Sequence, residues 1–225
     1  MNPAKNHLFF VCICFCLFSI PLSAQQEELF DGFLFPQYEK GYVILKENKN
    51  LRIASHLNYD TFNEKMLFLD TDSSVMELVG EDVLVVVIGE RAFLPSENGK
   101  SFYESVSTRE GQLFVQRKSK EISKGKAAGY GSYSATSAVE SLGHIDSSFG
   151  TKNLKSDELF KTKLDLYFYL KNGSKFEKFF STKTLGKLFK GKQADIETFA
   201  KENSTNFAKL EDVKKITEYC FSLSK

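Results

Sequence analysis

Short apolar segments separated by turns recur about every ten residues between positions 30 and 118, and this spacing limits the possible folds more than any other feature. The turns are rich in Gly, Asn, Asp, Glu and Ser. Strands are predicted at 42–46, 52–58, 65–70, 75–78, 83–88, 91–94, 101–106 and 112–118. Asn98 and Gly99 predict a tight hairpin, because both residue types tolerate positive φ. This spacing is typical of an antiparallel meander, sandwich or barrel.

One of these segments, 83–88, is apolar at every position and reads VLVVVI. A strand without a polar face is expected in the middle of a sheet, covered on both sides. The elements expected to cover it are the helices predicted at the C-terminal end of the chain.

A β-hairpin is predicted at 163–180. Leucine and phenylalanine alternate with polar residues and tyrosines over 163–171, and the Asn-Gly pair at 172–173 turns the chain into a second strand. This alternation indicates a strand that buries one face and exposes the other.

Helices are predicted after the hairpin. Ser181 or Thr182 can cap a short helix, a second helix carries Ile196 and Phe199, and a third spans 210–223 with apolar residues three and four apart. The predicted fold class is therefore α+β: an antiparallel β-rich meander, sandwich or partly open barrel, followed by a β-hairpin and two to three C-terminal helices.

The first 24 residues have the pattern of an export signal. Lys5 precedes an apolar run over 8–20, and Leu22-Ser23-Ala24 brings small residues before the polar Gln25. The alternative is a membrane anchor, but the run is shorter than the ~20 apolar residues that a spanning helix needs. We expect cleavage after Ala24, a periplasmic or secreted protein, and no stable membrane span after cleavage.

The expected organisation has four parts: a signal peptide at 1–24, a β-rich body at 25–122, a small and polar loop at 123–160, and a hairpin with a helical tail at 161–225. The tail is expected to pack on the same domain. The loop interleaves Tyr130 and Tyr133 with glycine, serine and alanine. An aromatic face on a small-residue loop suits adaptable recognition, so these tyrosines are the candidate ligand-binding residues. The alternative is that they pack on the sheet.

Charge and cysteine usage restrict the partners and the compartment. The chain has 30 basic and 29 acidic residues, which gives no basic footprint for nucleic acid. Of its four cysteines, only Cys220 lies outside the leader, so the exported chain has no internal disulfide. An exported protein without disulfides fits a bacterial envelope, and Cys220 is expected to be buried on the last helix.

Chemical motifs give no catalytic residue, no metal site and no cofactor. His56 is expected to face solvent beside Asn58, and His144 with Asp146 is a weak pair in a loop. The chain contains neither a G-x-S-x-G nucleophile motif nor a phosphate-binding G-x-x-x-x-G-K-[ST] motif. The Asp70-Thr71-Asp72 segment lacks the later ligands of a calcium loop and predicts a turn.

Several segments resemble exported proteins of unknown function from Bacteroidetes. The resemblance covers most of the chain after the leader, and it implies a Gram-negative envelope and no assigned activity. The segments that carry it are 23–25, 57–60, 65–70, 88–95 and the apolar positions of the helical tail over 185–219.

These observations predict a non-enzymatic exported binding or structural module of the bacterial cell envelope, whose partner is an envelope protein or a glycan. Two alternatives remain open. One is a hydrolase that uses carboxylates to cleave envelope or extracellular glycans, since the pairing of acids in space is not visible in a sequence. The other is a carrier with a Phe-lined cavity for an apolar ligand, because the chain has 22 phenylalanines.

Overall fold

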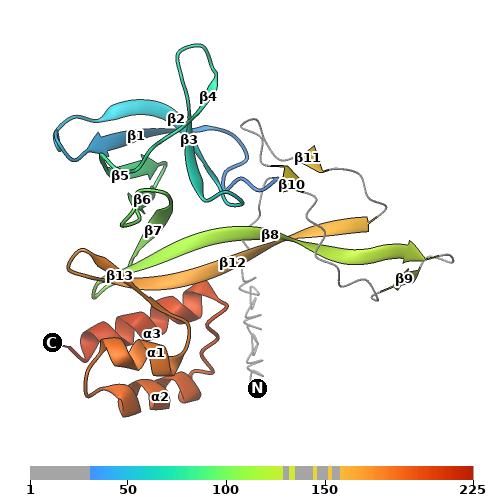
Figure 1. Cartoon of the computed structure of the whole chain (residues 1–225). Helices are drawn as coiled ribbons and strands as arrows, with labels where there is room; N and C mark the ends of the chain where they lie inside the picture. The colour runs from blue at the N-terminus through green and yellow to red at the C-terminus, as the bar shows by residue number, and fades with distance from the viewer. Residues whose placement is uncertain (1–30, 129–131, 135–143, 146–151, 154–157, 225) are drawn as a thin grey trace, which may run out of the picture.

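The computed structural model describes residues 31–128, 132–134, 144–145, 152–153 and 158–224. It confirms the α+β class: an 11-stranded antiparallel sheet is followed by three helices at the C-terminal end (Figure 1). No helix in these ranges is long and apolar enough to span a membrane.

The strands predicted from the turn spacing are all present, and their ends differ by up to three residues, except that the strand predicted at 112–118 continues to Ala128. The bounds are β1 Glu39–Leu45, β2 Ile53–Asp60, β3 Lys65–Leu69, β4 Val75–Glu77, β5 Val83–Ile88, β6 Arg91–Pro95, β7 Phe102–Ser107, β8 Gln112–Ala128, β9 Ser132–Ser134, β10 His144–Ile145, β11 Lys152–Asn153, β12 Glu158–Asn172 and β13 Lys175–Phe179. The helices are α1 Thr182–Leu188, α2 Gln193–Glu202 and α3 Leu210–Ser222. The strand order is β13-β12-β8-β7-β6-β5-β1-β2-β3-β4, with β9 beside β8, and β10 and β11 form a separate pair.

The expected loop at 123–160 is wrong at both of its ends. β8 continues to Ala128, β12 begins at Glu158, and the two strands pair from Glu158 opposite Lys126 to Tyr169 opposite Phe114. The paired strands form a ribbon that extends beyond the rest of the sheet (Figure 1). In a two-stranded ribbon, the hydrogen bonds between the strands satisfy the backbone groups, and they do so whatever the side chains are. The small and polar residues of this segment therefore gave no sign that the strands continue into it.

The turns that the Gly-containing pairs predict are confirmed. Gly99 has φ 68° between β6 and β7, and Gly173 has φ 59° between β12 and β13. The turn at 70–74 is also confirmed, because the Asp70 carboxylate accepts hydrogen bonds from the backbone N–H groups of Asp72 and Ser74, each at 2.9 Å.

The buried apolar residues form two cores. One lies among β1–β3 and β5–β7 and includes Tyr59, Val86 and Phe93. The other lies between the helices and the sheet formed by β8, β12 and β13, and includes Phe168 and Phe179. Each core has its own set of strands, and β7 and β8 are neighbours in the sheet where the two sets meet.

The expected helical cover on β5 is wrong. Val83, Val86 and Ile88 are buried in the first core, while Leu84 on the same strand is 37% exposed. The helices follow β13 through a short connection, and β13 is at one edge of the sheet, far from β5 in the strand order. The connection therefore places the helices on β8, β12 and β13.

A contact between the turn after β2 and the middle of β8 makes the sheet curl. The Ser119 backbone N–H donates to the Thr61 carbonyl at 2.8 Å, and the two side-chain hydroxyls lie 2.7 Å apart. Four strands (β7, β6, β5 and β1) separate β8 from β2 in the sheet order. A direct contact between the turn after β2 and β8 therefore requires this part of the sheet to curve around the first core.

The solvent-facing position expected for Asn58 is wrong, whereas His56 is exposed as expected. Asn58 is 2% exposed, and its amide nitrogen donates to the carbonyls of Phe35 and Gln37 at 3.0 and 3.2 Å. Its carbonyl oxygen accepts the Phe35 backbone N–H at 3.2 Å. The segment before β1 therefore covers this position, and Asn58 satisfies the backbone groups of that segment.

Cys220 on α3 is buried with no exposed surface, as expected. Burial raises the pKa of its thiol to about 12. We expect thiol reagents at pH 8 to modify Cys220 only when the helices open, because the reactive thiolate is scarce and inaccessible in the folded state. Labelling by iodoacetamide, followed by mass spectrometry across a urea series, measures this. Rapid labelling without urea, at the rate of the unfolded chain, would contradict it.

Candidate functional site

Ligand binding by the two tyrosines of the 123–160 segment stays a prediction. Tyr130 lies outside the described residues, and only the backbone of Tyr133 is described, in β9 opposite Ala127. His144 is likewise described only by its backbone, in β10 opposite Asn153.

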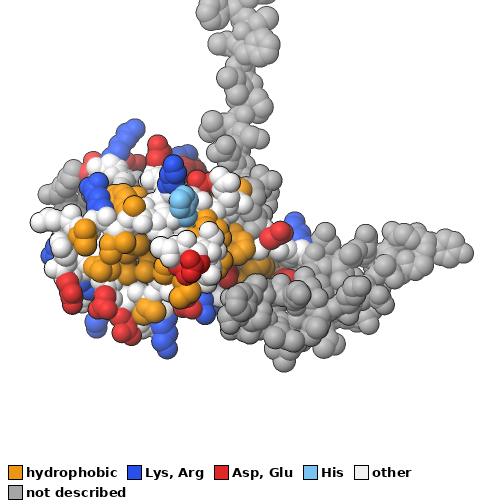
Figure 2. All heavy atoms as spheres, turned by 90° about the horizontal axis from the view of Figure 1, so that it is seen from above, with side chains coloured by type: hydrophobic (Ala, Val, Ile, Leu, Met, Phe, Trp, Pro, Cys, Tyr) orange, Lys and Arg blue, Asp and Glu red, His pale blue; other side chains and the backbone are white. Residues whose placement is uncertain are grey.

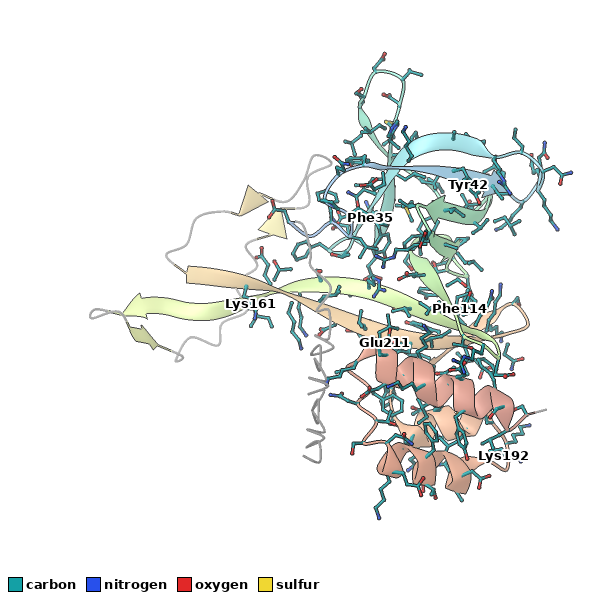
Figure 3. All side chains as sticks on the ribbon, turned by 180° about the vertical axis from the view of Figure 1, so that it is seen from behind. Phe35, Tyr42, Phe114, Lys161, Lys192 and Glu211 are labelled. Carbon is teal, nitrogen blue, oxygen red and sulfur yellow. The ribbon has the colours of Figure 1, made fainter. Side chains whose placement is uncertain are left out.

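Aromatic side chains do gather elsewhere, on the sheet face opposite the helices. The strand registers place Tyr103 of β7, Phe114 of β8, Tyr169 of β12 and Phe176 of β13 on this face, and Tyr167 lies beside them. The residues that alternate with them along the strands, such as Phe168 of β12, point to the helical core. We call Tyr103, Phe114, Tyr167, Tyr169 and Phe176 the outer aromatic cluster; Figure 3 labels Phe114 within it.

The rings of the outer aromatic cluster contact one another in two geometries. Tyr103 and Tyr169 stack with centroids 4.6 Å apart and an interplanar angle of 16°. Phe176 meets Tyr103 edge-on at 4.8 Å and 79°, and meets Phe114 at 5.0 Å and 79°. Tyr103 and Phe176 therefore form a corner of two nearly perpendicular rings.

Two lysines lie over this cluster. The Lys178 ammonium is 3.8 Å from the Tyr167 ring centroid, and the Lys171 ammonium is 5.3 Å from that of Phe176. Such cation–π contacts hold the lysine stems along the rings and cover part of the apolar surface.

A chain of hydrogen bonds fixes Tyr169. The Tyr169 hydroxyl donates to the Gln116 side-chain carbonyl at 2.6 Å, and Gln116 and Lys118 both bind the Glu64 carboxylate. Burial raises the pKa of the Tyr103 and Tyr169 phenols, and the nearby Glu64 charge adds to this for both. Both phenols are therefore neutral hydrogen-bonding groups throughout the physiological range.

A pocket of about 210 Å³ adjoins the corner, where the β6–β7 and β12–β13 hairpins come together. The Glu97 carboxylate joins the hairpins by accepting the Phe176 backbone N–H at 2.9 Å. The Asn98 side-chain carbonyl accepts the Ser96 hydroxyl at 2.8 Å, so the side-chain amide nitrogen of Asn98 is left to donate elsewhere. The lining residues are Ser96, Glu97, Asn98, Ser101, Tyr103 and Phe176.

A buried carboxylate lies away from this pocket, on the sheet face that carries Phe93 and Val115. Glu104 of β7 binds the Arg91 guanidinium through two hydrogen bonds of 2.7 and 2.8 Å, and also binds Arg117 at 2.8 Å. Burial alone would raise the pKa of Glu104, but the bond from Arg91 and the charges of Arg117 and Arg91 outweigh it and hold the pKa below 4.5. A carboxylate held ionised in this way is a poor general acid.

The sequence did contain a signal for the outer aromatic cluster. Tyr167 and Tyr169 stand at the positions of the predicted hairpin that alternate with its buried leucines and phenylalanine, so large rings were expected on the exposed face. Tyr103 and Phe176 join them only through strand pairing. In the part of the chain that the structure describes, no three His, Cys, Asp or Glu side chains are grouped to hold a metal ion.

Comparisons with known proteins identify no relative of this chain. No protein-family model, no curated protein and no solved structure matches the chain.

Proposed function

We propose that the protein is a non-enzymatic, exported binding module of the bacterial cell envelope, and that it holds a glycan at the pocket beside the outer aromatic cluster. The observation that carries this proposal is the corner formed by Tyr103 and Phe176 above a polar lining. Export is supported by the leader pattern at 1–24, and the nearly equal numbers of acidic and basic residues do not favour nucleic acid.

The chemistry of the corner suits a sugar ring. Small-molecule sites combine aromatic walls with a few placed polar groups that fix orientation. One face of a pyranose presents C–H groups that can lie on an aromatic ring, while its hydroxyls both donate and accept hydrogen bonds. The Asn98 amide can donate to such hydroxyls, and the Glu97 carboxylate and the serine hydroxyls can accept from them.

The size of the pocket suits a single sugar unit at the end of a glycan. Sites for drug-sized ligands have volumes of roughly 300–1,000 Å³. This pocket, at about 210 Å³, is smaller. It also has only one acidic lining residue, Glu97, whereas the hydrolase alternative needs two carboxylates.

Phe176→Ala is expected to weaken glycan binding about tenfold or more, because removing an aromatic anchor at the centre of a contact can cost about 2 kcal/mol and about 1.4 kcal/mol is already tenfold. The measurement is isothermal titration or NMR titration of the purified protein with N-acetylglucosamine oligomers and soluble peptidoglycan fragments. The matched control is Phe180→Ala, because Phe180 is 66% exposed and is not among the residues that line the pocket.

Two results would count against this proposal. One is the absence of binding to every glycan of the panel by the unaltered protein. The other is an equal loss of affinity in Phe176→Ala and Phe180→Ala, since the pocket would then have no special part in binding.

A further inference from the structure

A second hollow, independent of the glycan pocket, lies between α3 and the turn that joins β7 to β8. It has a volume of about 480 Å³. One wall is the end of β7 with the turn, and the other is a face of α3. Figure 3 labels Glu211 near the start of this helix. The lining residues, which we call the α3 groove, are Ser107, Thr108, Arg109, Glu211, Lys214, Lys215 and Glu218.

The two walls of the α3 groove are fixed to each other. Gly111 of the turn lies so close to the Phe221 ring that an added Cβ would be 2.6 Å from it. The turn itself is closed by the Thr108 hydroxyl, which donates to the Gly111 carbonyl and accepts the Gly111 N–H, both at 2.9 Å. The groove is therefore formed before any ligand arrives.

The helical wall is a single charged stripe. Glu211, Lys214, Lys215 and Glu218 have the spacing i, i+3, i+4, i+7, which places them on one face of a helix. The stripe extends over about two turns, or roughly 10 Å. The two lysines lie in its middle, with one carboxylate towards each end.

Such a stripe is expected to neutralise itself through pairs four residues apart, Glu211 with Lys215 and Lys214 with Glu218. Neither pair is formed. Glu218 instead accepts the Arg109 backbone N–H at 3.1 Å, and its carboxylate lies 3.7 Å from the Arg109 Nε. Within the described part of the chain, Lys214 and Lys215 have no ion-pair partner.

From this geometry we infer that the α3 groove binds a phosphate-bearing ligand, whose phosphate lies between Lys214, Lys215 and Arg109. The Arg109 side chain is 90% exposed, so its outer nitrogens remain accessible beside the two ammonium groups. Three cations face two carboxylates, one of which is already engaged by Arg109, and a phosphate ester carries a charge of about −1.5 to −2 at pH 7. Lysine ammonium groups bind phosphate as point charges, without the fixed geometry that a guanidinium fork requires.

The test is an NMR titration of the isotope-labelled protein with inorganic phosphate, against sodium chloride at matched ionic strength. Phosphate is expected to shift the amide signals around Ser107, Lys214 and Lys215 in a saturable manner, and chloride is not. The double substitution K214A/K215A should abolish the saturable shift. The control K187A/K201A removes two lysines from α1 and α2, outside the groove, and should leave the shift unchanged.

Glu211→Gln provides a test with the opposite sign. It removes a carboxylate that no described residue pairs, so phosphate affinity should rise by about two- to fivefold, the effect of one charge at a solvated site. A binding assay with phosphatidylglycerol vesicles distinguishes a soluble phosphate ester from the phosphate of a lipid headgroup. Response to phosphate without vesicle binding identifies a soluble phosphate ester, and response to both identifies a lipid headgroup.

The inference is overturned if phosphate causes no shift beyond that of chloride, if K187A/K201A removes the response as fully as K214A/K215A, or if vesicles bind without any phosphate response. None of these results depends on whether the glycan pocket is occupied.

Discussion

Glu104→Gln is expected to lower the free energy of unfolding by about 3 kcal/mol or more, because removing one partner of a buried ion pair leaves its counter-charges uncompensated. The Glu104 side chain is 9% exposed and that of Arg117 is 2% exposed. Glutamine keeps the size of the side chain but cannot accept the same charge-assisted bonds from Arg91 and Arg117. Urea denaturation followed by circular dichroism at pH 7 measures the change.

The matched control is Glu77→Gln. Glu77 pairs with Lys65 at 2.9 Å, but both side chains are more than a third exposed, so this pair contributes less than about 1 kcal/mol. An equal loss of stability in Glu104→Gln and Glu77→Gln would show that burial of the Arg91–Glu104–Arg117 cluster has no special effect.

The effect of Glu104 also has a defined pH dependence. Its pKa is lower in the folded protein than its ordinary value of 4.5. A carboxylate with a depressed pKa stabilises the fold above the unfolded-state pKa, and this contribution is lost as the pH falls through the folded-state value. The difference between the original protein and Glu104→Gln should therefore be full at pH 7 and should shrink below about pH 4.5. A difference that grows in acid would contradict this assignment.

Phe179→Ala is expected to destabilise the protein by about 3–5 kcal/mol, the usual cost of truncating a buried phenylalanine. Phe179 has no exposed surface and connects β13 to the helices, with its ring 6.1 Å from that of Phe168 and 6.3 Å from that of Phe207. Denaturation monitored at 222 nm should show the loss, because the helices pack on this core.

The chain offers an adjacent control in Phe180→Ala. The same substitution one residue later removes a ring that is 66% exposed, so stability should change by less than about 0.5 kcal/mol. Equal losses of stability in Phe179→Ala and Phe180→Ala would contradict the burial of Phe179 in the helical core.

Much of the fold could be predicted because its information is local. The conformation of the turns at Gly99 and Gly173 is determined by the residues next to them in the sequence. Two antiparallel strands that are joined by a tight turn pair with each other. Two of the errors concern cover by distant segments. Asn58 was expected on the surface because nothing in its own strand shows that the segment around Phe35 lies over it. The position of the helices relative to β5 likewise depended on the strand order.

The candidate site was less predictable for the same reason. Tyr167 and Tyr169 were predicted on the exposed face of a half-buried strand, but Tyr169 is buried. Tyr103 joins them only through a register that spans three strands. The Arg91–Glu104–Arg117 cluster is a similar case, because each arginine is 13 positions from the glutamate in the sequence. No short motif has that spacing, and the three side chains meet only because β6, β7 and β8 are adjacent.

The long ribbon of β8 and β12 also has a consequence for the order in which the molecule folds. The helical core takes residues from both strands, and the chain between Ala128 and Glu158 separates them in the sequence. The early strands pair mostly with their neighbours in the sequence, so they can assemble quickly. Pairing of β8 with β12 instead brings together segments that are distant in the sequence, and the entropy cost of this step precedes any stabilising contact between them. Consolidation of the three helices is therefore kinetically tied to a non-local strand pairing.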